Sequence, residues 1–285
     1  PSIPWSVWSE DAASHARALA LFSLRHDQRP DVIRFQEVTQ RFCNPPRFQP
    51  WFRDGVCSDG GSGGGVDPYG VVMLGKKGLH PTYKFHRLPT SQGRSLLTAD
   101  LLGGLVRVGT VHLESLDTYP LRVKQLEICA KVLSKSTNAL LCGDFNFDDR
   151  RNVSGHGPLE NDWLGHVLPD FQDLWPALRG AEDGYTFDSN RNPVIRHHER
   201  MRYDRVMLSR SRGGADPHLE PQSINLLGIH TLDSTVYGLN LAPPAKFALP
   251  DWMANDGTPK DKLCPSDHFG VIAVFSFAQI EEGIR

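Results

Sequence analysis

Residues 139–146 read Ala-Leu-Leu-Cys-Gly-Asp-Phe-Asn, an apolar run that changes abruptly into acidic and amide side chains. The apolar part, Ala139–Cys142, is short and uncharged, which is typical of a buried strand. Asp144 and Asn146 alternate along the chain, so both side chains point to one face of an extended segment. An Asx-stabilised turn would explain the same residues equally well, so this stretch alone leaves both interpretations open.

Four other runs have the same design, an apolar strand that ends in carboxylate, amide or imidazole side chains. They are Phe35-Gln36-Glu37-Val38, Val111-His112-Leu113-Glu114-Ser115, Tyr203-Asp204-Arg205 and Pro265-Ser266-Asp267-His268-Phe269-Gly270. Each has an ordinary explanation, because Glu37 could be a surface residue, His112 a core histidine and Ser266–His268 a helix cap. Five such runs in one chain favour an active site, since strand ends on one rim of a sheet direct side chains into one crevice.

The segments around these runs predict an α/β (α+β) fold. Apolar residues recur at helical spacing over Asp11–His26 and Arg122–Ser134, which predicts two amphipathic helices. Strands are expected at Asp31–Val38, Tyr69–Leu74, Ser95–Leu102, Leu105–Leu113, Ala139–Cys142, Arg202–Leu208 and Val271–Phe277. Because no linker or repeat divides the chain, we expect one domain over residues 1–285, with packed sheets and helices outside. Residues 235–262 are expected to form a surface insertion and Asp59–Val66 a flexible glycine loop.

Composition excludes several classes of protein. The 285 residues are 39% hydrophobic and 22% charged, which excludes a disordered chain. No apolar run approaches the roughly 18 residues of a membrane helix. The net charge of −2 implies that any polyanion is bound locally, in a groove. The five cysteines are widely spaced without a C-x-x-C pair, which argues against zinc and disulfides and predicts an intracellular protein, in the nucleus or cytoplasm. We expect no secretory signal, and the initial Pro1 suggests that upstream residues are missing.

The five runs together resemble the endonuclease/exonuclease/phosphatase superfamily of Mg²⁺-dependent phosphodiesterases and phosphomonoesterases, in which Q-E, G-D-x-N and S-D-H elements form one site. Further elements resemble its tyrosyl-DNA phosphodiesterase branch. They are His112–Ser115 (T-H-L-E-S there), Tyr185–Asp188 (Y-T-W-D), Arg202–Arg205 (R-F-D-R), Pro265–Gly270 (P-S-D-H-W-G) and the pair Gly93-Arg94. The match runs from about Trp5 to Phe277. It implies a four-layer sandwich of two packed mixed β-sheets flanked by helices.

The resemblance also implies roles for individual side chains. Metal binding falls to Glu37, the main Mg²⁺ ligand, with Asp267 and Ser6 near the ion, and Mn²⁺ is expected to substitute. The catalytic set is Asp144, which positions and deprotonates the attacking water, Asn146, His112 and His268 as donors to the phosphate, and Asp204, which orients His268. Substrate contacts are expected from Ser115, Arg94, Arg150, Phe187, Tyr203 and Tyr69, the aromatic residues by stacking.

One position departs from the pattern, because the superfamily's first strand usually ends in Trp-Asn and Trp5 is followed here by Ser6. The implied activity is hydrolysis of 5′-phosphotyrosyl links in DNA, which leaves a 5′-phosphate. The expected partner is single-stranded or 5′-overhang DNA with a tyrosyl adduct, bound by a monomer without a membrane. Three alternatives stay open: another nuclease of the superfamily (deadenylase-like or abasic), a phosphoinositide phosphatase, and an inactive member that only binds a partner.

Overall fold

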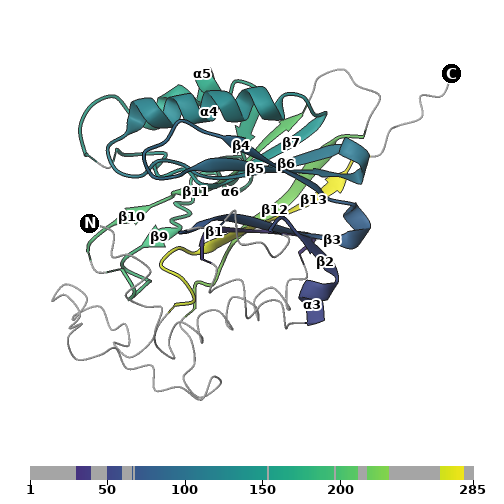
Figure 1. The fold of residues 1–285 in the computed structure, drawn as a ribbon. Helices are drawn as coiled ribbons and strands as arrows, with labels where there is room; N and C mark the ends of the chain where they lie inside the picture. The colour runs from purple at the N-terminus through teal and green to yellow at the C-terminus, as the bar shows by residue number, and fades with distance from the viewer. Residues whose placement is uncertain are drawn as a thin grey trace, which may run out of the picture. The chain divides into compact units, whose positions relative to one another are not determined.

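The computed structural model describes residues 30–39, 50–59, 66, 68–152, 154–195, 197–210, 217–230 and 264–278 (Figure 1). Ser6, the helix expected at Asp11–His26, the interior of the glycine loop and the insertion at 235–262 lie outside them.

The chain forms two compact units, each built from three segments. The larger unit comprises Asp31–Gly184, Arg202–Asn225 and Val271–Arg285, and the smaller comprises Pro1–Pro30, Tyr185–Met201 and Leu226–Gly270. A single catalytic domain over residues 1–285 stays a prediction.

A six-stranded mixed sheet forms the centre of the larger unit. Its strands, in spatial order, are β4 (Thr82–Arg87), β5 (Ser95–Leu101), β6 (Val106–His112), β7 (Asn138–Asp144), β11 (Asp204–Arg210) and β8 (Phe171–Asp173). Only β6 and β7 run parallel, and the other neighbours are antiparallel. The carboxyl ends of β6 and β7 therefore lie at the same rim as the start of β11.

Helix α4 (Tyr119–Leu133) makes the crossover between the parallel strands β6 and β7 and packs on both of them (Figure 1). It begins three residues before the predicted start, because Pro120 fits the first helical turn. Its buried side includes Leu126, Cys129 and Leu133, and also the polar Arg122 and Gln125. The apolar pattern did not predict these two polar residues, and both hold the loops of the site described below.

A second, antiparallel sheet packs on the six-stranded sheet, through contacts of β1 and β3 with β5, β6 and β7 (Figure 1). Its order is β1 (Val32–Val38), β3 (Gly70–Lys76) and β2 (Gly55–Cys57), and the short helix α3 (Pro50–Arg53) precedes β2. The Gln36 side chain donates a hydrogen bond to Thr110 Oγ1 of β6 at 3.0 Å. The larger unit thus has helix, sheet and sheet layers, which confirms the predicted α/β fold with packed sheets; the second sheet, however, is antiparallel and not mixed.

The remaining elements are two longer strands, which pair as a two-stranded sheet, and several short elements. They are η3 (Lys77–Leu79), η4 (Leu102–Gly104), η5 (Glu160–Trp163), α5 (Leu164–Val167), α6 (Leu174–Arg179), β9 (Phe187–Asp188), β10 (Arg200–Met201), β12 (Leu219–Leu227) and β13 (Gly270–Phe277). In the smaller unit, β9 and β10 pair antiparallel, with Phe187 opposite Met201.

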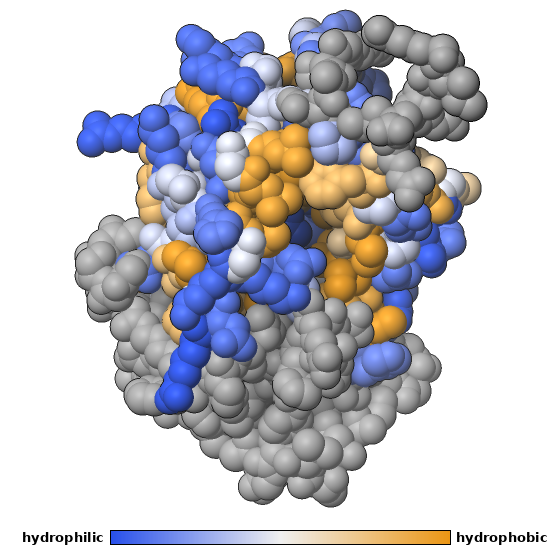
Figure 2. Space-filling view, turned by 90° about the vertical axis from the view of Figure 1, so that its right-hand side faces the viewer, coloured by the Kyte–Doolittle hydropathy of each residue, from blue (hydrophilic) through white to orange (hydrophobic). Residues whose placement is uncertain are grey.

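The main core of the larger unit lies where α4 and the 145–168 segment meet the six-stranded sheet. Its buried residues include Leu96, Val111, Leu126, Leu141 and Phe145. On the face shown in Figure 2, apolar side chains gather among hydrophilic ones. No helix in the part of the chain that the structure describes is long and apolar enough to cross a membrane.

Candidate active site

Three of the predicted site residues form a row across neighbouring strands. His112 ends β6, Asp144 ends β7 and Asp204 begins β11. In the sheet register, Asp144 is paired with His112 on one side and with Asp204 on the other. The directions of these strands therefore place the three residues at one rim of the sheet, although His112 and Asp204 are 92 positions apart in the sequence.

The backbone of the G-D-x-N turn requires a glycine. Gly143 has φ +127°, and a Cβ at this position would lie 2.0 Å from the carbonyl oxygen of Val111 on β6. After it, Asp144 Oδ1 accepts a hydrogen bond of 2.8 Å from the backbone N–H of Asn146, which has φ 57°. The Asn146 side chain donates to the Leu113 carbonyl at 2.9 Å. The Asx turn is thus present, and it orients the Asp144 carboxylate at the rim.

His112 is the point at which three charged side chains meet. Its Nε2 lies 3.4 Å from Asp144 Oδ2, and its Nδ1 lies 3.8 Å from Glu37 Oε1. Arg94 Nη1 lies 2.9 Å from the same Nδ1. Because a guanidinium can only donate, Nδ1 must accept, and the imidazole is then neutral with its proton on Nε2, facing Asp144.

Glu37 reaches the site through an irregularity in β1. The pairing of β1 with β3 shifts register between Phe35 and Val38, and Glu37 has φ 54°. A bulge of this kind inserts one extra residue and redirects a side chain. The Glu37 side chain is 35% exposed, so its carboxylate remains accessible to solvent.

A second group of donors lies beside His112. The Arg94 guanidinium, 5.6 Å from the ring centre of Tyr69, donates to His112 and, at 2.9 Å, to Gln92 Oε1. Gln92 also bonds to Ser115, the last residue of the H-L-E-S run. The buried Arg94 Nε has no hydrogen-bond partner among the described residues. An unsatisfied buried donor of this kind is expected to meet water or a ligand, because leaving it unpaired costs about 1–3 kcal/mol.

Glu114, in the same run, is a functional support that our sequence analysis did not single out. It is fully buried, and it accepts hydrogen bonds from Thr90 Oγ1 at 2.7 Å, Ser91 N at 2.8 Å and Gln125 Nε2 at 3.2 Å, and one from Ser91 Oγ. Burial alone would raise the pKa of Glu114, but the bonds from Ser91, Thr90 and Gln125 outweigh it and lower the pKa. The charged carboxylate therefore fixes the loop that carries Arg94.

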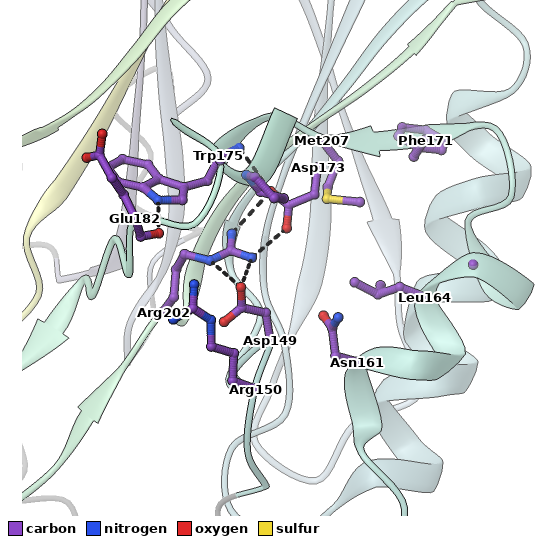
Figure 3. A pocket seen from close by; sticks show the side chains of 13 residues that line it. Asp149, Arg150, Asn161, Leu164, Phe171, Asp173, Trp175, Glu182, Arg202 and Met207 are labelled. Atoms are coloured by element: carbon purple, nitrogen blue, oxygen red, sulfur yellow. Dashed lines mark hydrogen bonds and ion pairs between the residues drawn. The ribbon is translucent and has the colours of Figure 1, made fainter. Parts of the chain in front are cut away.

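The two arginines that flank Asp204 are structural. Arg202 is buried and bonds to Asp149 Oδ2 at 2.9 Å and Asp173 Oδ2 at 2.8 Å, across an open pocket of about 470 Å³ (Figure 3). Burial acts to lower the pKa of Arg202, but the two carboxylates raise it. Arg205 lies against the Phe147 ring, and burial is the main cause that lowers its pKa to about 10. Both side chains are held within the protein, so they anchor the ends of β7 and β11.

Two predicted substrate contacts are engaged inside the larger unit. Arg150 lines the same pocket, pairs with Asp183 and donates to the Ala181 carbonyl at 3.0 Å. The Tyr203 side chain belongs to the core, because the residue is only 7% exposed, and its carbonyl accepts a bond of 2.9 Å from Phe145 N. This burial favours packing over stacking on a base for Tyr203.

The smaller unit brings together Phe187 and His268, whose ring centres are 5.0 Å apart with an edge-on geometry. The S-D-H loop is held by Asn192, a buried side chain that our sequence analysis did not single out. Its amide donates to the carbonyls of Ser266 at 2.8 Å and Asp267 at 2.9 Å. Asp204 belongs to the larger unit, so its pairing with His268 stays a prediction, as does the place of Asp267 near a metal.

The chemistry of the donors fits a hard divalent cation, although no group of three or more His, Cys, Asp or Glu side chains in the described ranges is arranged as a metal site. The exposed carboxylate of Glu37 is an oxygen ligand of the kind that Mg²⁺ takes, and Mg²⁺ commonly needs only one or two protein carboxylates beside its waters. The described cysteines, by contrast, are dispersed in the sequence, which does not suit zinc.

The chain matches the Endonuclease/Exonuclease/phosphatase family over residues 5–268. It therefore belongs to this family, whose members are hydrolases that act on phosphoric ester bonds.

Individual relatives agree with this assignment. Tyrosyl-DNA phosphodiesterase 2 of Mus musculus is 29% identical over 237 residues, which are 79% of this chain and 57% of the mouse protein. The chain thus spans little more than half the length of this curated relative. Among solved structures, D. rerio TDP2 complexed with single strand DNA product has a TM-score of 0.66 at 20% identity, over 94% of each chain. The human Nocturnin catalytic domain with bound sulfate anion has a TM-score of 0.54 at 16% identity, over 93% of this chain and 87% of that chain. At these identities, the structural likeness shows the fold.

Proposed function

We propose that this chain hydrolyses the 5′-phosphotyrosyl bond between DNA and a tyrosine, leaves a 5′-phosphate, and so removes trapped topoisomerase remnants during DNA repair. The observation that carries the proposal is the convergence of Glu37, Asp144 and Arg94 on His112. Carboxylates suit a cation and an attacking water, and guanidinium and imidazole donors suit phosphoryl oxygens. The choice of a tyrosyl ester rests on the name of the mouse relative and on the branch-specific motifs.

The proposed cofactor is Mg²⁺, with Mn²⁺ as a substitute. Glu37 would be its main protein ligand, and Asp267 and Ser6 are proposed to lie near it. When bound, the ion would supply positive charge to the phosphate in the transition state.

The residues of the chain have separate tasks in the proposed reaction. Asp144, held through Oδ1 by the Asn146 backbone, orients a water and takes its proton as the new P–O bond forms. The bond between phosphorus and the tyrosyl oxygen breaks, and the phenolate leaves and takes a proton from solvent, to which Asp144 later releases the proton that it accepted. His112 Nε2–H, Asn146 and His268 donate to the phosphoryl oxygens, and the proposed task of Asp204 is to orient His268.

The proposed substrate is a single-stranded or overhanging 5′ end, bound by a monomer inside the cell, in the nucleus or cytoplasm. Tyr69 is 37% exposed beside Arg94, so its ring can stack on a base or on the phenol. Phe187 lies against His268 and is proposed for the same task. The relative from D. rerio is titled as a complex with a single strand DNA product, which supports a substrate of this kind.

A substrate panel tests the proposal. With Mg²⁺, 5′-phosphotyrosyl single strands should be cleaved faster than an abasic duplex, poly(A) RNA or an inositol phosphate. EDTA should abolish turnover, and Glu37→Ala should raise the Mg²⁺ concentration required for half-maximal rate. Full activity in EDTA would exclude the metal-dependent reaction. A preference for the abasic duplex, the RNA or the inositol phosphate would assign the chain to another branch of the family.

A further inference from the structure

Gln92 lies between two of the proposed substrate contacts, at the edge of the larger unit's site. Its Oε1 accepts hydrogen bonds from Arg94 Nη2 at 2.9 Å and from the backbone N–H of Ser115 at 3.0 Å. Its Nε2 lies 2.8 Å from Ser115 Oγ. One half-buried amide therefore joins the β4–β5 loop, which carries Arg94, to the end of the H-L-E-S run.

The neighbours of Gln92 determine which way its amide points. Arg94 Nη2 and Ser115 N can only donate, so the atom that faces both of them must be the amide oxygen. Turning the amide over would set its NH₂ group against two donors. The nitrogen consequently faces the hydroxyl of Ser115.

The hydrogen-bond partners of the Ser115 hydroxyl also indicate whether it donates or accepts. Its Oγ also lies 3.0 Å from Gln92 Oε1, so the hydroxyl could donate to that oxygen or accept from Nε2. The two lone pairs of Oε1 are already used by Arg94 and the Ser115 backbone. The hydroxyl therefore accepts from Nε2, and its own hydrogen, which meets Oε1 at 3.0 Å only as a third donor to that oxygen, can turn to a better acceptor on a ligand.

Gln92 is itself held firmly. Thr90 Oγ1 accepts from the backbone N–H of Gln92 at 3.0 Å and from that of Arg94 at 2.9 Å, and it donates to the buried Glu114 at 2.7 Å. Gly93, between them, has φ +76°, which sets the turn. The loop is thus tied to a fully buried carboxylate before any substrate arrives.

We propose that Gln92 is a positioning residue, which holds the Arg94 guanidinium and turns the Ser115 hydroxyl hydrogen toward a phosphoryl oxygen of the substrate. The inference rests on the proposed function in placing a phosphate ester beside Arg94 and Ser115. Preorganised donors of this kind act mainly on the transition state, so Gln92 affects kcat more than KM.

The test compares Gln92→Met with the wild type on a 5′-phosphotyrosyl oligonucleotide and on bis(4-nitrophenyl) phosphate, a simple phosphodiester without DNA or tyrosine. Methionine keeps the length of the side chain and removes every hydrogen bond. For whichever of the two substrates the wild type cleaves, we expect Gln92→Met to lower kcat about tenfold, to change KM less than threefold and to leave Tm nearly unchanged. The matched control is Gln222→Met on β12, which removes an amide bonded to the Ser276 hydroxyl at 2.9 Å and should leave kcat unchanged.

A double-mutant comparison separates positioning from loop stability. In a Ser115→Ala background, Gln92→Met should cost clearly less than in the wild type, because one of the two groups that it positions is gone. Equal losses in both backgrounds, or a loss that follows a lower Tm, would overturn the proposal.

The two substrates separate failure of this inference from failure of the proposed function. Cleavage of the simple diester alone would refute the tyrosyl substrate. The kcat values of the variants on that diester would still test the role of Gln92. If neither diester is cleaved, the affinity for orthovanadate, which imitates the five-coordinate phosphorus of the transition state, decides. A several-fold weaker Kd in Gln92→Met supports the inference, and an unchanged Kd overturns it.

Discussion

At the scale of single residues, the neutral tautomer of His112 has a chemical consequence. Arg94 occupies Nδ1, so the imidazole presents an N–H from Nε2 without carrying a charge of its own. Its Nε2–H faces Asp144 Oδ2 at 3.4 Å as a neutral donor, so it orients the carboxylate without placing an imidazolium charge against the proposed base. Arg94 thereby contributes to the proposed catalysis through His112 as well as through its own charge.

Asp144→Asn should lower kcat by at least about 10²-fold, the scale expected when a general base is removed. Asparagine retains an oxygen that can accept from the Asn146 backbone, so Tm should change little. The matched control is Asp100→Asn on β5, which lies opposite Arg107, at the other end of the strand from the site. Stopped assays measure kcat and thermal melts measure Tm for both variants. Near-wild-type turnover of Asp144→Asn would exclude Asp144 as the general base.

Gly143→Ala should destabilise the fold by about 3 kcal/mol or more, because alanine is strained at φ +127° and its Cβ would collide with the Val111 carbonyl. Gly165→Ala is the control, since a Cβ there meets nothing within 4 Å in helix α5. It should be neutral or stabilising by up to about 1 kcal/mol. Urea denaturation measures both, and comparable stability of the two variants would contradict the clash.

The sequence predicted residues that end strands more readily than residues that support them. His112, Asp144 and Asp204 could be found because each follows an apolar run, and sheet register then aligned them. Glu114 stood in the H-L-E-S run without a predicted role, and Gln92 gave no local signal. Glu114 bonds to Ser91, and Gln92 bonds to Ser115, in each case across 23 residues of sequence. The roles of both residues therefore depend on contacts that only the folded chain makes.

At the scale of elements, the loop between β4 and β5 behaves as a preassembled part of the site, because a buried carboxylate organises it. The ionised Glu114 carboxylate accepts hydrogen bonds from three groups of the loop, the hydroxyls of Thr90 and Ser91 and the backbone N–H of Ser91. Its amide partner Gln125 comes from α4, and Arg122 of the same helix donates to the Glu114 carbonyl at 2.8 Å. The polar residues on the inner side of α4 therefore transmit the position of the helix to the site.

The depressed pKa of Glu114 predicts a pH dependence of stability. The native pKa lies below the ordinary value of 4.5, so the stabilisation is complete above 4.5 and is lost as the pH falls through the native pKa. Glu114→Gln should be less stable than the wild type at pH 7, and the difference in Tm should shrink below pH 4.5. Melts from pH 7 to pH 3 measure it, and parallel Tm curves for the two proteins would contradict the assigned charge state.

Elements with a strong apolar pattern were predicted correctly, and weakly patterned ones were not. The strands β1, β3, β5, β6, β7, β11 and β13 and helix α4 are confirmed within a few residues. The edge strand β4 was not predicted, because Thr82–Arg87 is mostly polar and exposed. Strand β8 has three residues, too few to show any period. Pairing with a neighbouring strand, rather than local sequence, determines both.

At the scale of the whole molecule, charge balance limits how the proposed DNA substrate can be recognised. The net charge is −2, and several arginines are already paired inside the larger unit, among them Arg122, Arg202 and Arg205. A strongly basic surface would hold long stretches of backbone, whereas the proposed reaction, in a chain with this net charge, is expected to gain its affinity near the scissile phosphate. Local donors such as Arg94 and exposed rings such as Tyr69 supply contacts of that kind.

The salt dependence of binding should therefore be shallow. If the protein neutralises about three phosphates of a single strand, log Kd should change with log salt by a slope of about 2. We would measure Kd by fluorescence anisotropy for 5′-phosphorylated strands of 4, 8 and 16 nucleotides, in EDTA to prevent turnover, between about 50 and 300 mM salt. Affinity should level off by the 8-nucleotide strand, because contacts are confined to the 5′ end. A slope above about 5 that grows with strand length would reveal an extended basic groove and contradict local recognition.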